Sequence, residues 1–302
     1  MKELSFKSFD NKEIAYCLWD DVKEKKAVVQ IVHGMAEHIL RYDDFAKFLN
    51  SNGYIVIGDD HRAHGRTEGE SRRGISDKNC FDNTVRDLEM LSDIAIKKYK
   101  LPLFVLGHSY GSFLTQKYIQ LRSDRIKGAV LSGSAFMGSA LVKLGKLIAN
   151  LQGAFIDHEK PAKLISKLSF GAFSNPFKDS DLPNRWLSRD QEIVKKYNAD
   201  TYCGYVMSIG FQVSFMNGVT KLYTAEGLNN IRKDLPIFIA SGALDPVGGN
   251  GKLVNQLFNI YGLTGLTDLS LRLYEDARHE ILNETNKDEV YNDILSFFND
   301  KL

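Results

Sequence analysis

A serine flanked by two glycines offers the clearest chemistry in this chain. Residues 107–111 read Gly-His-Ser-Tyr-Gly, a G-x-S-x-G pentapeptide that directly follows the apolar run 103–106. The next segment, 112–122, carries apolar residues at helical spacing, so the pattern predicts a strand, a sharp turn and a helix, with Ser109 at the apex of the turn. Such a turn lifts a hydroxyl above the sheet and points the helix N-terminus at any oxyanion formed there. The sequence therefore predicts that Ser109 is a covalent nucleophile.

A nucleophilic serine needs a base to remove its proton, and the base needs an acid to orient it. Two late strand-like runs are followed by suitable residues, with Asp245 after residues 236–240 and His279 after residues 269–274. His279 is the only histidine after His158, which makes it the expected base. The chain order serine, acid, histidine is the order expected when each group follows a strand of one sheet.

Asp245 is preferred as the acid over four other carboxylates. Asp234 and Asp268 precede their strands and would lie at the opposite end of the sheet. Glu275 and Asp276 share the loop of His279 and stay open as weaker alternatives. The sequence thus predicts a Ser-His-Asp arrangement with Asp245 as its acid.

Acyl transfer also requires hydrogen-bond donors for the oxyanion. One expected donor is the backbone N–H of Tyr110, the residue after the nucleophile. The other is expected from the tight His-Gly-Met loop at residues 33–35, from the N–H of Met35. Because both donors are backbone groups, side-chain identity says little about them.

The remaining early histidines carry no expected catalytic role. His33 begins the tight loop and is expected to be structural. His38, His61 and His64 lie on early loops, where packing or hydrogen bonding is favoured over lining the site. The side chain of His108, inside the pentapeptide, is expected to point away from the site. No set of residues has metal-ligand spacing, so the sequence predicts neither a metal nor a cofactor.

The hydrophobic pattern indicates which elements position these residues. Near-continuous apolar runs predict buried strands, four of them at 27–32, 54–57, 103–106 and 128–132. Their alternation with amphipathic helices predicts an α/β fold with a mostly parallel sheet and helices on both faces. Residues 136–216 interrupt this rhythm with helical pieces and a polar loop, which predicts an insertion.

The composition is typical of a soluble protein with a large core. The chain has 302 residues, of which 43% are hydrophobic and 25% charged, and a net charge of +1, which gives no sign of a nucleic-acid surface. Its three cysteines are odd in number and widely spaced, so free thiols in a reducing compartment are expected. No signal-like segment or run near the roughly 20 residues of a membrane span occurs. A cytoplasmic location is expected, and the oligomeric state is left open.

These motifs also occur together in a fixed order. They lie at residues 33–38, 41–42, 60–67, 107–111, 245–246 and 274–279. The set resembles the α/β-hydrolase branch of monoacylglycerol lipases, bacterial lysophospholipases and related serine aminopeptidase-like proteins. The resemblance covers a core formed by residues 1–135 and 217–302. It implies the α/β-hydrolase fold, with residues 136–216 as a helical cap over the site.

The resemblance also implies the residues of the site. It assigns the triad and the oxyanion donors to Ser109, Asp245, His279, Met35 and Tyr110. Two departures from the usual pattern occur, because Tyr110 stands where methionine is common and Ala63 replaces a common glycine. Neither departure touches the chemistry, although Tyr110 would change the shape of the acyl pocket. Residues 245–251 further resemble a lysophospholipase-like subgroup.

The activity expected from this resemblance is cleavage of single-chain lipid esters, either monoacylglycerols or lysophospholipids. The insertion contains apolar residues that fit this preference, namely Phe136, Leu141, Val142, Leu144, Leu147, Ile148, Leu151, Phe155 and Ile156. The same residues fit ordinary packing of cap helices on the core equally well. Lys143 and Lys146 would suit transient contact of the cap with an anionic membrane surface.

Other activities stay open on the same residues. A soluble carboxylesterase for short acyl or aryl esters would need the same triad. An aminopeptidase would also need an acidic group in the cap for the substrate amine, for which Asp157, Glu159 and Asp200 are candidates. The acyl-enzyme could pass its acyl group to an alcohol other than water. A non-catalytic binding scaffold is disfavoured, because all three triad positions are filled.

Overall fold

A single twisted sheet forms the centre of the computed structural model, which describes the backbone of residues 1–302 and all side chains except those of residues 140, 141, 169 and 170. The strand order is β1-β2-β4-β3-β5-β6-β7-β8. The strands are β1 (Lys2–Lys7), β2 (Glu13–Trp19), β3 (Ala27–Val32), β4 (Tyr54–Asp59), β5 (Leu103–His108), β6 (Gly128–Ser132), β7 (Ile237–Gly242) and β8 (Leu269–Tyr274). β2 pairs antiparallel with β1 and β4, and the other neighbours are parallel.

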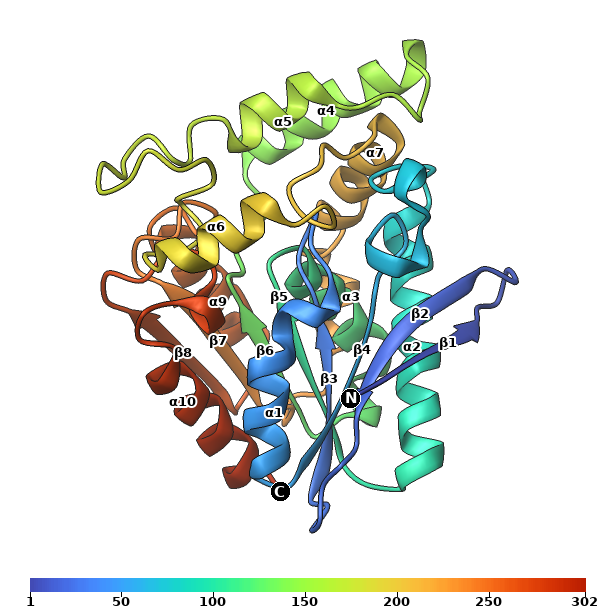
Figure 1. Ribbon diagram of the computed structural model, residues 1–302, viewed down its shortest axis with the longest axis vertical. Coiled ribbons are helices and arrows are strands. Elements are labelled where there is room, and N and C mark those ends of the chain that lie inside the picture. Colours follow the sequence, from blue (N-terminus) through green and yellow to red (C-terminus); the bar gives the residue numbers. More distant parts are fainter.

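Helices cover both faces of the sheet (Figure 1). They are α1 (Asp43–Ser51), α2 (Cys80–Tyr99), α3 (Tyr110–Arg122), α4 (Ala140–Phe155), α5 (Lys163–Phe170), α6 (Gln191–Ala199), α7 (Ile209–Val219), α8 (Ala225–Asn229), α9 (Lys252–Leu263) and α10 (Lys287–Asp300). α1 and α10 pack on one face of the sheet, whereas α2, α3 and α9 pack on the other. The prediction of a mostly parallel sheet covered on both faces is confirmed.

The burial of the strands explains why their sequences are almost entirely apolar. Every residue of β3, β4, β5 and β6 is buried, because each side chain points into one of the two helical layers. β8 lies at the edge of the sheet and alternates between partly buried and exposed residues. This alternation matches the period of two that is visible in its sequence.

The insertion lies over the carboxyl ends of the parallel strands, at the top of Figure 1. α4 packs against α7 through an apolar cluster that includes Ala149, Val213 and Met216. α7 also packs on the main core through Phe211 and Phe215. Helix α7 is buried on all sides because it packs against both α4 and the main core. The predicted end of the insertion, residue 216, lies within this helix.

Two further expectations concern the side chain of Leu141 and membrane-spanning helices. Leu141 was expected to belong to the apolar stretch, but its side chain lies outside the described residues. Over the described residues, no helix combines the length and apolar character that crossing a bilayer requires.

Candidate active site

Ser109 occupies a strained turn between β5 and α3. Its φ of 52° and ψ of −119° lie in a region that non-glycine residues rarely adopt. The flanking glycines are required by close packing, because a Cβ on Gly107 would collide with Thr115 and one on Gly111 with the carbonyl oxygen of Val32. The predicted strand, sharp turn and helix are therefore present at the pentapeptide.

Ser109, His279 and Asp245 lie in one chain of hydrogen bonds. The Oγ of Ser109 is 2.8 Å from Nε2 of His279, and Nδ1 of His279 is 2.9 Å from Oδ2 of Asp245. The three residues follow the carboxyl ends of β5, β8 and β7, which adjoin the same edge of the sheet. These distances are those a serine nucleophile, a base and an orienting acid require.

Asp245 is held by more than the imidazole. Its Oδ1 accepts a hydrogen bond from the backbone N–H of Val247 at 2.8 Å, and its Oδ2 accepts one from the hydroxyl of Ser241 at 3.1 Å. Burial alone would raise the pKa of Asp245, but the charge of His279 and these hydrogen bonds outweigh it, so the pKa lies below its ordinary value. The carboxylate is therefore ionised and fixed in orientation.

The imidazole of His279 shows the complementary shift. Burial would lower its pKa, but the Asp245 carboxylate, with the charges of Glu280 and Glu37, outweighs burial, so the net pKa lies above the ordinary value. The lowered pKa of Asp245 and the raised pKa of His279 both indicate that the carboxylate stabilises the imidazolium. Such a histidine can take a proton from Ser109 and hold it while a reaction proceeds.

The competing carboxylates lie away from this chain. Glu275 and Asp276 are exposed on the surface of the loop. Asp268 forms an ion pair with Lys301, and Asp234 forms one with an arginine close to it in sequence. Asp245 is thus the carboxylate that the structure brings to His279.

The loop of Gly34 and Met35 lies directly against the nucleophile. A Cβ on Gly34 would be only 3.3 Å from the Cβ of Ser109. On the other side, Tyr110 is the first residue of α3, so its N–H has no intrahelical acceptor. Gly34, the neighbour of Met35, and Tyr110 therefore both adjoin Ser109, and the assignment of the two amides as oxyanion donors stays a prediction.

A buried ionic network holds this loop, and sequence reasoning gave its members no role. Oε1 of Glu37 accepts hydrogen bonds from the N–H of Gly34 at 2.5 Å and from the hydroxyl of Tyr42 at 2.8 Å. Arg41 bridges Glu37 and Glu280, donating to the two Glu280 oxygens at 2.7 and 2.6 Å. Burial would raise the pKa of Glu280, but Arg41 lowers it to about 2. The network ties the Gly34 loop to the residue next to His279.

Three buried histidines, His33, His61 and His64, lie next to the Gly34 loop. His33 bonds to the carbonyl of Gly34 through Nδ1 at 2.8 Å and accepts from the N–H of His61 through Nε2 at 3.1 Å. Its ring stacks on that of His61 at 3.8 Å between centroids. Burial lowers the pKa of His64 to about 3, so that ring is neutral. These contacts match the structural roles expected of the three residues.

Two aromatic rings lie closer to His279 than the sequence suggested. The ring of His108 is 4.8 Å from that of His279, so the expectation that it points away from the site is wrong. Its Nδ1 lies 3.1 Å from the hydroxyl of Ser132. The ring of Trp186, from the insertion, lies 5.0 Å from that of His279.

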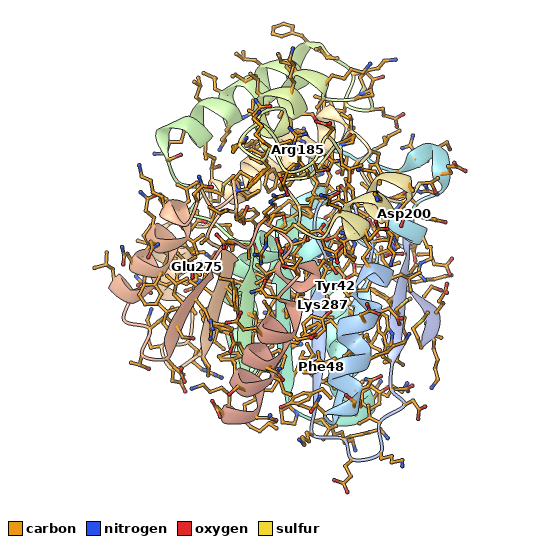
Figure 2. All side chains as sticks on the ribbon, turned by 60° about the vertical axis from the view of Figure 1, so that its left-hand side comes forward. Tyr42, Phe48, Arg185, Asp200, Glu275 and Lys287 are labelled. Atoms are coloured by element: carbon orange, nitrogen blue, oxygen red, sulfur yellow. The ribbon has the colours of Figure 1, made fainter. Side chains whose placement is uncertain are left out.

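Part of the insertion is bound firmly to the His279 loop. Arg278 donates to the carbonyl of Arg185 at 2.6 Å, and Arg189 forms an ion pair with Glu284 at 2.9 Å. Figure 2 labels Arg185 and Asp200 in the insertion, above Tyr42 of the core. The segment around Trp186 is thereby held beside the site. No pattern in the sequence indicated these contacts, which join residues about 90 positions apart.

Several known proteins are similar to this chain in both sequence and fold. A monoacylglycerol lipase of Mycolicibacterium smegmatis is 29% identical over 98% of this chain and 96% of its own length. The human monoglyceride lipase is 28% identical over 93% of this chain and 84% of its own. The crystal structure of a thermostable carboxyl esterase from Bacillus coagulans superposes with a TM-score of 0.89 at 28% identity, covering 99% of this chain and 97% of that one.

A sequence model of the Hydrolase_4 family, described as serine aminopeptidase S33, matches residues 23–286. That range contains the Gly34 loop, the serine turn, the insertion and the His279 loop. The predicted resemblance is confirmed: this chain belongs to the serine aminopeptidase S33 family and has the α/β-hydrolase fold.

Proposed function

We propose that this protein is a serine hydrolase that cleaves carboxylic esters of single-chain lipids, monoacylglycerols or lysophospholipids, through an acyl-enzyme on Ser109. The observation that carries the proposal is the continuous hydrogen-bonded chain from Ser109 through His279 to Asp245. Support for the lipid class comes from the relatives whose names are monoacylglycerol lipase and monoglyceride lipase.

The proposed reaction begins with proton transfer from Ser109 to Nε2 of His279. Ser109 attacks the ester carbonyl, and the oxyanion receives hydrogen bonds from the amides of Met35 and Tyr110. His279 then protonates the leaving alcohol, which breaks the ester bond and leaves the acyl group on Ser109. In the second half, His279 takes a proton from water, the hydroxide attacks the acyl-enzyme, and the fatty acid leaves. Asp245 stays ionised throughout and stabilises the imidazolium.

We assign residues 136–216 the role of a cap that receives the lipid from a surface. Leu147, Leu151 and Phe155 are spaced along one side of α4 and are 55%, 53% and 87% exposed. Leu168 on the neighbouring α5 is 65% exposed. Lysines accompany both helices at positions 143, 146, 163 and 167. Exposed apolar residues beside lysines suit an interface with lipid, so transient membrane contact belongs to the proposal.

The free state of all three cysteines fits the reducing compartment in which we place the protein, the cytoplasm. No further group is needed for the proposed reaction, since the nucleophile, base, acid and oxyanion donors all come from the chain.

The test of the proposal is covalent labelling by a fluorophosphonate probe, combined with turnover of nitrophenyl esters of increasing chain length. The wild type should be labelled, and Ser109→Ala should not. Ser51→Ala removes an exposed hydroxyl at the end of α1 and should label like the wild type. A rate optimum at medium or long chains supports the lipid class. A folded wild type that is not labelled would contradict any role of Ser109 as a nucleophile.

A short-ester carboxylesterase is the second candidate, because a carboxyl esterase is the solved structure with a TM-score of 0.89 to this chain. Turnover confined to short chains would favour it. An aminopeptidase would need a cap carboxylate for the substrate amine. Of the three expected candidates, Glu159 is paired with Arg72 and Asp200 is bonded to His38. Asp157 is exposed and accepts a hydrogen bond from the N–H of Glu159 at 3.0 Å, so it stays open as the amine-binding group. Cleavage of an aminoacyl amide in preference to esters would nevertheless overturn the ester hydrolase proposal.

A further inference from the structure

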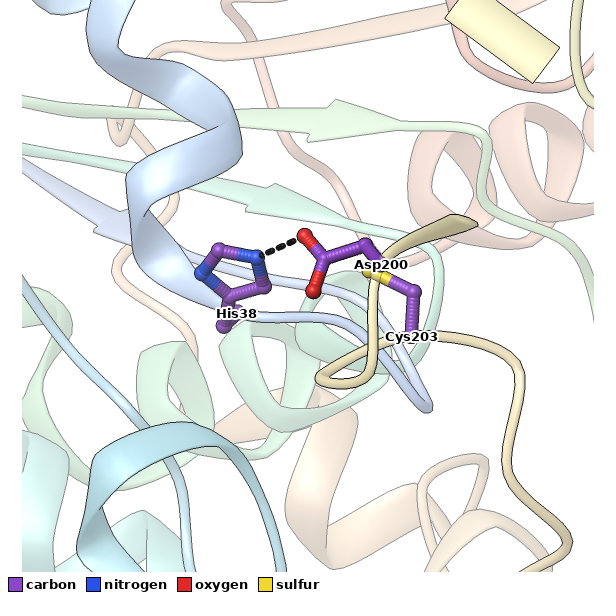
Figure 3. Close-up of side chains that lie close together, drawn as sticks. All are labelled: His38, Asp200 and Cys203. Atoms are coloured by element: carbon purple, nitrogen blue, oxygen red, sulfur yellow. Dashed lines mark hydrogen bonds and ion pairs between the residues drawn. The ribbon is translucent and has the colours of Figure 1, made fainter. Parts of the chain in front are cut away.

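Three side chains of types that can bind a metal lie close together where the insertion contacts the Gly34 loop. His38 follows that loop, whereas Asp200 and Cys203 follow α6 in the insertion (Figure 3). Nε2 of His38 is 2.8 Å from Oδ2 of Asp200, and one ligand atom from each of the three residues lies within 4.8 Å of the other two. In the part of the chain that the structure describes, this is the one group of its kind.

We propose that His38, Asp200 and Cys203 form a binding site for a divalent transition metal of the zinc class. An imidazole nitrogen, a carboxylate oxygen and a thiolate sulfur are ligands that zinc prefers, and magnesium or calcium would not select the sulfur. Zinc bonds of about 2.0–2.3 Å in a tetrahedron place neighbouring ligand atoms about 3.5 Å apart. A small rotation of the side chains therefore closes the cluster around one ion, with water as the fourth ligand.

The surrounding charges favour a cation at this position. The carboxylates of Glu37, Asp200 and Glu280 act on Cys203 against the single guanidinium of Arg41. Arg41 is itself neutralised, because it is buried between Glu37 and Glu280. Glu37 and Glu280 share the one guanidinium of Arg41, so negative charge remains in excess around the cluster, and a divalent ion would offset it.

The same surroundings argue against a reactive cysteine. Burial raises the pKa of the Cys203 thiol well above its ordinary value, while Arg41 lowers it and the carboxylates of Glu37, Asp200 and Glu280 raise it. Without a cation the group is a thiol, which is a weak nucleophile and resists oxidation. A metal ion is the agent that would convert it to a thiolate.

A path to solvent is available for the ion. His38 and Asp200 line a cleft of about 260 Å³ together with Arg41 and Tyr197. The side chain of Asp200 is 31% exposed. A hydrated ion can therefore reach Asp200 and His38 from this cleft.

Binding would release protons. The Sγ–metal bond forms as the Cys203 thiol loses its proton to solvent. His38 binds through Nε2 as a neutral imidazole, so the proton that Nε2 shares with Asp200 moves to Nδ1 or, if the ring is charged, leaves to solvent. Affinity should fall as the pH is lowered, because protons compete with the metal for both residues.

The bound ion would also join two parts of the site. His38 lies three residues after Met35, and the insertion already contacts this loop through the N–H of Gly204, which donates to the carbonyl of Ala36 at 2.9 Å. A metal across His38 and Cys203 would clamp the insertion to the loop. If the cap must move to admit a lipid, zinc should inhibit ester turnover; this consequence rests on the function proposed above, whereas the binding site does not.

The experiment uses the full-length protein freed of metal and titrated with cadmium, whose bond to a thiolate gives an ultraviolet charge-transfer band. One band-forming ion per chain is expected in the wild type and none in Cys203→Ala. Cys80→Ala removes a different buried thiol and should keep the band. A band that persists in Cys203→Ala, or no band in the wild type, overturns the site.

Zinc affinity and melting temperature provide the second measurement. His38→Ala and Asp200→Asn should bind zinc at least about tenfold more weakly, with His158→Ala as a histidine control outside the cluster. Saturating zinc should raise the melting temperature of the wild type and not that of Cys203→Ala. Equal affinity in all variants contradicts the assignment. Cys203→Ser replaces the alanine variant if the latter does not fold.

The activity measurement separates the two proposals. Zinc should inhibit nitrophenyl ester turnover by the wild type and spare Cys203→Ala. Inhibition that is equal in both variants would contradict the clamp. A wild type without esterase activity that still shows the cadmium band would refute the proposed function while the metal site stands.

Discussion

The inner and outer parts of the insertion are built in opposite ways. The inner part, residues 185–190, is tied to the His279 loop by hydrogen bonds and an ion pair, and its Trp186 packs on the imidazole. The outer part, α4 and α5, leaves large apolar side chains exposed and contacts the core mainly through α7. Polar contacts with little exposure to solvent thus fix the geometry near the reacting atoms. The surface that would meet the lipid is left apolar and open.

The residues of the site and those of the cap also differ in burial and in the number of their polar partners. Asp245, His279, Glu37 and Glu280 are buried, Arg41 is 10% exposed, and each of these polar groups is hydrogen-bonded. Changes there should therefore have large effects, since a buried charge without its partner is costly. Changes on α4 should affect only how the protein meets a surface.

Asp245→Asn tests the inner region most directly. The asparagine can occupy the same space but holds the wrong imidazole tautomer, so kcat for a nitrophenyl ester should fall about 10,000-fold. Asp276→Asn changes an exposed carboxylate on the His279 loop and should leave kcat within about twofold. Similar losses in both variants would mean that Asp245 is not the orienting acid.

Arg41→Met tests whether the buried network positions the Gly34 loop. Removing the cation leaves Glu37 and Glu280 buried without a partner, so the free energy of unfolding in urea should fall by about 3–5 kcal/mol. Below the melting temperature, kcat should fall by about 100-fold with little change in KM, because the amide of Met35 would shift.

The matched control for this network is Arg72→Met, which breaks an ion pair with Glu159 in which both side chains are more than half exposed. It should leave kcat unchanged and alter stability only marginally, since solvent screens such pairs. If Arg41→Met lowers stability but leaves kcat intact, the network is structural and does not position the oxyanion loop.

Phe155→Ser tests the outer region. The side chain is 87% exposed, so its loss should leave the melting temperature and short-ester turnover unchanged. Partition onto anionic lipid vesicles should weaken by about tenfold, because an aromatic side chain contributes apolar area at an interface. Leu263→Ser on α9 is equally exposed, at 87%, and lies outside the insertion. Equal weakening in both variants would remove the cap from the proposed interface.

The pH profile of kcat/KM sharpens the view of the inner region. Proton removal from Ser109 requires neutral His279, and the Asp245 carboxylate raises the pKa of that imidazole above its ordinary value. Activity should therefore rise with pH and bend above about 6.5, where a free histidine titrates. An acid limb that bends below that value would contradict the raised pKa of His279.

Much of the fold follows from local patterns in the sequence. Continuous apolar runs such as residues 103–106 predict buried strands, because a strand between two helical layers needs no polar face. The turn at Ser109 is equally local, since two glycines permit the close approach of strand and helix. The order of Ser109, Asp245 and His279 along the chain then indicated which residues should meet. Backbone preferences and side-chain periodicity operate over a few residues, so a sequence displays them directly.

Contacts between distant segments required the folded structure. Arg41 meets Glu280 across 239 positions, and His38 meets Asp200 across 162. Trp186 lies next to His279 because Arg278 and Arg189 bind the two loops together. The spacing of these residues in the sequence does not predict this contact. The energy of each such contact depends on burial and on the partners available, which exist only after the sheet and the insertion have packed. Local physics therefore placed the elements, whereas packing between them chose the partners of the charged groups.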